Sequence, residues 1–139
     1  MDTKFSVSVH ALILISESPT PISSDRMAES VGTNASYIRK ILALLKKAEI
    51  VKGHRGISGY ILTVAPEQLT LLQVYQAVTE KSKLHLLDIH QSPNDRCIVG
   101  RHIKPVLTGI FSDIEEGFAR LLAGKTLADC IAGIRKRIS

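Results

Sequence analysis

The sequence NASYIRKILALLKKAEIVKGHRGISGYIL, residues 34–62, carries the strongest structural signal in the chain. Asn34 is a favourable N-cap residue, and the apolar residues after it recur at spacings of three and four, which predicts an amphipathic helix through about Lys47. Residues 50–51 and 60–64 are rich in β-forming types, and three glycines lie between the two runs. We therefore expect a helix followed directly by a two-stranded hairpin.

Two further helices are predicted before this stretch. Residues 5–17 are apolar on most sides, which is typical of a buried helix. The segment 18–24 contains two prolines and interrupts that helix. A short second helix is expected over 25–31, capped by Ser23 or Ser24.

Three more elements are predicted after the hairpin. A helix is expected over about 70–79, and residues 80–96 have the composition of an irregular connector. A long amphipathic helix covers roughly 99–123, and Thr126 caps a last helix that ends near Arg137. The predicted fold class is mainly α with a small β-hairpin wing: a winged helix-turn-helix plus a long C-terminal dimerisation helix. The predicted organisation is a DNA-binding domain at 1–79, a connector at 80–98, and the dimerisation and C-terminal helices at 99–139.

The positive charge of the chain is concentrated near the third predicted helix. The 139 residues suffice for one ordinary domain, and the formal net charge is +5 with a pI of about 9.4. Residues 36–55 hold six Lys and Arg against one Glu, a local balance of +5 that equals the charge of the whole chain. This distribution favours a polyanionic partner.

The order helix, helix, turn, helix, hairpin is that of a winged helix-turn-helix, in which one helix enters the major groove of double-stranded DNA. Arg39 is the best candidate for a guanine contact, Lys47 and Lys52 for phosphates, and Arg55 for the minor groove. A solvated surface face is the alternative for any one of these side chains. The candidate DNA-contacting residues are Asn34, Ser36, Tyr37, Arg39, Lys40, Lys47, Lys52, His54 and Arg55.

The long helix carries an apolar stripe whose members advance by steps of three and four, close to a coiled-coil pattern. We expect a second copy of the chain to pack there, and two-fold symmetry would then present two recognition helices to successive major grooves. A helix buried within its own domain is the alternative. The candidate dimerisation residues are Ile103, Leu107, Ile110, Ile114, Phe118 and Leu121.

Three segments, KFSVSVHALILIS, MAESVGTNASYIRKILALLKKAEIVKGHRGISGY and LTLLQVYQAV, resemble the Rrf-two family of bacterial transcription regulators, the relatives of IscR, NsrR and CymR. The family pattern SxxYLxxILxxLxKAGLVxSxRGxxGGYxL is matched by residues 36–62, with a hairpin that is one residue shorter here. The chain is most similar to the cluster-free, YwnA-like branch. The resemblance implies a homodimer on a near-palindromic operator, with the long helix as the dimer interface.

The cysteines argue against an iron–sulfur cofactor. Cluster-bearing members of the family place three cysteines in the connector, whereas this connector has only Cys97, so no cofactor and no metal site are expected. The spacing of His85, His90, Cys97 and His102 matches no compact metal motif. A redox or metal sensor that uses Cys97 and the nearby histidines stays an alternative, with Cys97 as the candidate sensing residue.

The sequence does not indicate an enzyme, because it lacks a phosphate-binding glycine loop, a metal-ligand pair on a helix and a nucleophile motif. The apolar run at 9–15 is too short to span a bilayer, so we expect a cytoplasmic protein without membrane contact. We predict a sequence-specific DNA-binding transcription regulator, a homodimeric repressor that reads an inverted repeat and responds to an unidentified small-molecule or protein effector. A winged-helix module that binds a protein instead of DNA is the alternative.

Overall fold

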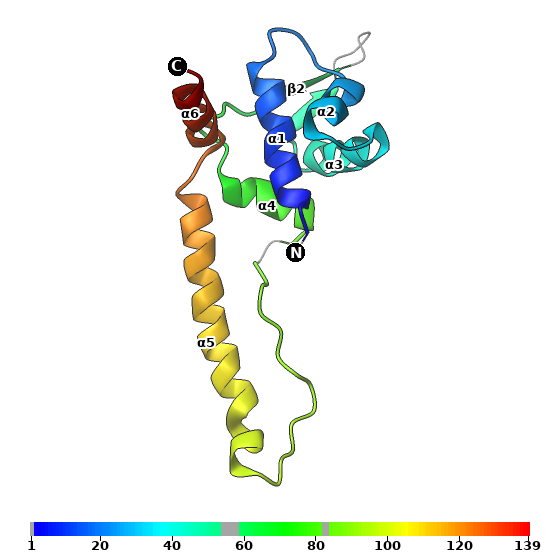
Figure 1. Ribbon diagram of the computed structural model, residues 1–139. Coiled ribbons are helices and arrows are strands. Elements are labelled where there is room, and N and C mark those ends of the chain that lie inside the picture. Colours follow the sequence, from blue (N-terminus) through cyan, green and yellow to red (C-terminus); the bar gives the residue numbers. More distant parts are fainter. Residues whose placement is uncertain (1, 54–58, 82–83) are drawn as a thin grey trace.

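The computed structural model describes residues 2–53, 59–81 and 84–139. A compact head lies at one end of the molecule, and one long helix extends away from it (Figure 1). The predicted fold class is confirmed: helices dominate the described residues, and the two strands form one antiparallel hairpin. The elements are α1 (Lys4–Glu17), α2 (Ser24–Val31), α3 (Ala35–Lys47), β1 (Val51–Gly53), β2 (Tyr60–Leu62), α4 (Leu71–Thr79), α5 (Ile98–Ala123) and α6 (Leu127–Ile138).

Four helices begin at a side-chain cap. In each case the side-chain oxygen accepts a hydrogen bond from a backbone amide in the first turn, which satisfies a donor that has no partner inside the helix. The predicted caps at Asn34 and Thr126 are confirmed, and Ser23 rather than Ser24 caps α2. Thr70 caps α4 through a full capping box with Gln73.

The hydrophobic core lies between α1, α3, α4, β1 and the start of α6. α3 contributes one stripe of fully buried side chains, as its periodicity predicted. The prediction of a buried first helix holds for only one face of α1, because Val9 and Ile13 on the other side stay partly exposed. The buried residues of α1 and α3 are Ser8, Ala11, Leu12, Ile15, Ile38, Ile41, Leu42 and Leu45.

The hairpin is attached to the segment that precedes α2. Val51 pairs with Leu62 and Gly53 with Tyr60, and Tyr60 also forms a bridge with Ile22. A Cβ atom added at Gly59 would lie 2.7 Å from the Cβ of Pro21, so only glycine fits this close approach. The base of the hairpin is thus held next to α2 and α3.

The connector runs beside α5 to its far end (Figure 1). No helix or strand occurs among its described residues, 81 and 84–97, as the sequence predicted. Lys104 Nζ lies 3.3 Å from the carbonyl oxygen of Gln91, which fastens the connector to α5. α5 has 26 residues and continues through Pro105. Among the described residues, no helix combines the length and hydropathy needed to cross a membrane.

The last helix returns to the head. The amide of Leu71 donates to the carbonyl of Lys125, and the amide of Leu127 donates to the carbonyl of Leu69, both at 2.9 Å. These bonds join the turn between α5 and α6 to the start of α4. α6 then packs against α1 (Figure 1), where Arg135 forms an ion pair with Glu17.

Candidate nucleic-acid interface

The outward face of α3 is polar and cationic. Ser36, Arg39 and Lys40 are exposed on its first two turns, while the opposite stripe is buried in the core. Because residues three, four and seven apart share one side of a helix, Lys47 continues this face toward the C-terminal end of α3. α3 therefore presents a cationic face to solvent, and a major groove is wide enough to admit an α-helix.

Side-chain contacts already position several of these residues. Asn34 Oδ1 accepts a hydrogen bond from the amide of Tyr37 at 2.8 Å, so its oxygen is used in the helix cap. Tyr37 is half-buried and packs against the core. Arg39 Nη1 lies 3.5 Å from Ser24 Oγ, which places the guanidinium near the first residue of α2. Asn34 and Tyr37 thus have structural roles in addition to any contact with DNA.

The remaining candidates flank the helix. Lys47 Nζ lies 3.7 Å from a carboxylate oxygen of Glu80, and both side chains are well exposed. An exposed ion pair of this kind is weak, so Lys47 stays accessible to a phosphate. Lys52 is exposed on β1 beside α3. His54 and Arg55, the predicted contacts of the hairpin tip, lie outside the described residues.

α5 carries an apolar face that the described part of the chain leaves largely exposed. The exposed fraction is 50% for Ile110, 52% for Ile114, 43% for Phe118 and 71% for Leu121. Large apolar side chains grouped along one helix on a surface indicate an interaction site. Two other members of the predicted dimerisation set, Ile103 and Leu107, are half-buried.

The comparison with known sequences agrees with this geometry. Residues 1–133 match the family described as Rrf2, iron-dependent transcriptional regulator. The chain belongs to the Rrf2 family. The predicted resemblance is thereby confirmed, together with the predicted function of a DNA-binding transcription regulator. The relatives of this Rrf2 chain are regulators and not enzymes, in agreement with the prediction that it is not an enzyme.

Individual relatives cover nearly the whole chain. YwnA of Bacillus subtilis (strain 168), provisionally named an HTH-type transcriptional regulator, is 35% identical over 129 residues, which are 93% of this chain and 95% of YwnA. A crystal structure provisionally described as a DNA-binding protein is 32% identical and has a TM-score of 0.74, with 92% of this chain and 98% of that chain covered. T. potens IscR shares the fold at 23% identity, with a TM-score of 0.71 over 96% of this chain and 87% of IscR.

The family description calls its members iron-dependent, but the residues of this chain do not fit an iron–sulfur cluster. A cluster is usually held by several thiolates, and Cys97 is the only cysteine between α4 and α5. The second cysteine, Cys130, lies on α6. Within the described ranges, no three His, Cys, Asp or Glu side chains converge closely enough to hold a metal ion.

Cys97 occupies the N-cap position of α5 and is exposed. The backbone amides of Gly100 and then Val99 lower the pKa of its thiol, although neither reaches the geometry of a full hydrogen bond. By contrast, burial first and the Asp129 carboxylate second raise the pKa of Cys130. The pKa values of the two thiols are thus shifted in opposite directions, and the redox alternative would need the lower one at Cys97.

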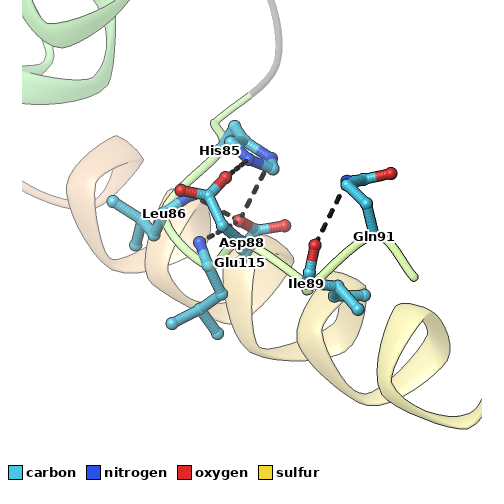
Figure 2. A network of polar contacts seen from close by, with 7 residues as sticks. His85, Leu86, Asp88, Ile89, Gln91 and Glu115 are labelled. Carbon is cyan, nitrogen blue, oxygen red and sulfur yellow. Dashed lines mark hydrogen bonds and ion pairs between the residues drawn. The ribbon is translucent and has the colours of Figure 1, made fainter. Parts of the chain in front are cut away.

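Glu115 was missed by the sequence analysis. It is 7% exposed on α5, and its carboxylate accepts hydrogen bonds from the amides of Leu86 and Leu87 in the connector, the latter at 3.0 Å. Figure 2 shows Glu115 reaching from α5 toward His85, whose ring lies 2.8 Å from Asp88 and 3.7 Å from Glu115. The sequence offers only a weak signal, namely that Glu115 follows Phe111 by four residues and shares its face.

Proposed function

We propose that this Rrf2 regulator is a homodimeric repressor that binds an inverted repeat in the cytoplasm and blocks transcription sterically, without an iron–sulfur cofactor. The cationic face of α3 supplies the contacts to base edges and phosphates. The single observation that carries the dimer is the exposed apolar stripe on α5, formed by Ile110, Ile114, Phe118 and Leu121. The relatives support the regulator class.

The exposed stripe on α5 is better explained by contact with a second copy of the chain than by contact with another element of the same chain. Fully burying a large aliphatic or aromatic side chain contributes about 1.5–3 kcal/mol, and each of these four still exposes 43–71% of its surface. The head is already packed, and α6 lies on α1, so no described element is left to cover the stripe. If a two-fold axis passed through the stripe, the stripes of the two copies would pack against each other and both would be covered.

The experiment combines assembly with DNA selection. Purified protein is bound to sheared genomic DNA at low and at moderate salt, and the retained fragments are sequenced, while light scattering gives the mass of the free protein. A shared inverted repeat bound by two chains, with retention that falls steeply with salt, is the expected result. Retention of DNA without an enriched repeat would contradict sequence-specific DNA binding. No retention of DNA at low salt would favour the alternative that the winged helix binds a protein.

The repressor role needs its own readout. A promoter that contains the enriched repeat is transcribed in vitro with and without the protein. Occupancy of a site that overlaps the polymerase-binding region is expected to lower the amount of transcript. A protein that raises transcript from the same promoter would be an activator, which would refute the repressor role and leave DNA binding intact.

A further inference from the structure

Strand β2 is paired along both of its edges. On one edge it pairs with β1, and on the other edge Tyr60 forms an antiparallel bridge with Ile22, which lies between α1 and α2. The amide of Tyr60 donates to the carbonyl of Ile22 at 2.9 Å, and the amide of Ile22 donates to the carbonyl of Tyr60 at 3.4 Å. These bonds attach the base of the hairpin to a segment outside the hairpin, so the orientation of the hairpin depends on that segment.

The contact beside this bridge is closer than a residue with a side chain allows. A Cβ atom added at Gly59 would lie 2.7 Å from the Cβ of Pro21, 2.8 Å from its carbonyl carbon and 3.1 Å from the amide nitrogen of Ile22. Two of these atoms are backbone and the third belongs to a rigid proline ring, so none can turn aside. The backbone of Gly59 does not itself require glycine, because Gly32 is the only glycine with a positive φ among the described residues. Glycine is therefore needed here for the contact with Pro21.

The segment that holds the hairpin also holds the recognition helix. Residues 21–24, the α2 entry segment, lead directly into α2, which packs on α3. Ser23 caps α2 by accepting a hydrogen bond from the amide of Arg26 at 3.3 Å, and Ser24 Oγ lies 3.5 Å from Arg39 Nη1 on the outward face of α3. Four consecutive residues thus connect the base of the hairpin with α2 and α3.

We propose that the α2 entry segment sets the distance between α3 and the hairpin on DNA, with Gly59 as the positioning residue that lets the hairpin dock on Pro21. α3 enters the major groove, and Lys52, exposed on β1, contacts a phosphate beside it. Phosphate contacts fix the register of a protein on the duplex, so this distance determines which base edges Arg39 meets. The inference rests on the proposed function, because it assigns DNA contacts to both α3 and the hairpin.

The variant Gly59→Ala tests the role of this distance. Ordinary contacts between carbon atoms begin near 3.4 Å, so the hairpin must move away from Pro21 by at least about 0.7 Å. α3 buries its own apolar stripe in the core and should stay in place. In a hydroxyl-radical footprint on the operator selected with the unmodified protein, we expect the protection at the major groove to persist and the protection of the adjacent backbone to be lost. The slope of log affinity against log salt should become shallower by about one for each hairpin withdrawn.

The hairpin offers a matched control. Gly53→Ala is the same substitution in the same hairpin, but a Cβ atom added at Gly53 meets no atom within 4 Å, so the footprint and the salt slope should stay unchanged. Circular dichroism verifies that both variants fold. Pro21→Ala tests the same contact from the other side, because it frees the entry segment from the fixed φ of proline and should weaken the same protection. Its control is Pro19→Ala, an exposed proline of the same loop.

The outcomes separate this inference from the proposed function. If the unmodified protein binds its operator and a folded Gly59→Ala gives the same footprint and slope, the positioning role is overturned while DNA binding stands. Loss of the central and the adjacent protection together would also overturn it, because Gly59 would then support the head as a whole. If Gly59→Ala does not fold, an unchanged footprint in Pro21→Ala overturns the role instead. Absence of specific binding by the unmodified protein would refute the proposed function and this inference with it.

Discussion

The contact between Glu115 and the connector makes a sharp prediction. The substitution Glu115→Ala removes a carboxylate that accepts from two backbone amides, those of Leu86 and Leu87. No other acceptor for these amides is found in the described part of the chain, so both would have to turn to water. We expect the connector to detach locally from α5 while the core of the head stays folded.

The size of the effect follows from the environment of the two amides. Hydrogen bonds to a charged group contribute about 1.5–3 kcal/mol each when they are protected from water. Leu86 is 36% exposed, so water replaces part of what is lost. We therefore expect a total loss of about 2 kcal/mol in local stability, which corresponds to roughly 30-fold faster exchange of these amide hydrogens.

Hydrogen exchange followed by NMR measures this directly at Leu86 and Leu87. Glu116→Ala is the matched control, because Glu116 is the next residue on the same helix and its side chain is exposed. Amides of the core, such as that of Leu42, should exchange at the same rate in both variants. Equal protection of Leu86 in the two variants would refute the assigned role of Glu115.

Four further predictions use other parts of the chain. Arg39→Ala should weaken operator binding by about 1–3 kcal/mol and lower the salt dependence in a filter-binding assay, and equal affinity would exclude Arg39 from the interface. Ile114→Asp should convert a dimer into a folded monomer in light scattering, because Ile114 is 52% exposed in the single chain. Cys97, with its lowered pKa, should react with iodoacetamide before Cys130 at neutral pH, because a larger fraction of Cys97 is thiolate. Mass spectrometry of the labelled protein gives the order, and earlier labelling of Cys130 would contradict the prediction. Glu49→Gly should raise stability by about 0.5–1 kcal/mol in urea unfolding, because Glu49 has a φ of 61° that glycine adopts without strain, and a loss would contradict this.

The helices were largely predictable, because the signals that start them are local. Asn34, Thr70 and Thr126 each precede an apolar period, and each accepts a hydrogen bond from an amide three residues later. A cap and the helix it starts lie within one turn, so sequence proximity is enough to identify both. The hairpin followed in the same way from two short β-rich runs separated by glycines.

Contacts between distant segments were not predictable in this way. The carboxylate of Glu115 meets an amide 29 residues earlier in the chain, and nothing in the intervening sequence indicates that distance. Gly59 looked like an ordinary hairpin glycine, whereas its true constraint is the close approach of Pro21. Such pairings depend on how the helices pack, and a helical period gives no information about packing partners.

The same limit explains why the sequence suggests a role for the polar face of α3 but not for the exposed apolar face of α1. On α3 the face proposed to contact DNA is the polar one, and its charges are visible in the sequence. An apolar face, in contrast, has three physical uses, namely the core, a subunit contact and a ligand site, and the same spacing of Ile and Leu serves all three. Exposure separates only the core from the other two uses: Leu12 is fully buried, whereas Ile114 is 52% exposed and Ile134 is 44% exposed. The apolar surplus of α1 and α6 is therefore the part of this chain where structure adds most to the sequence.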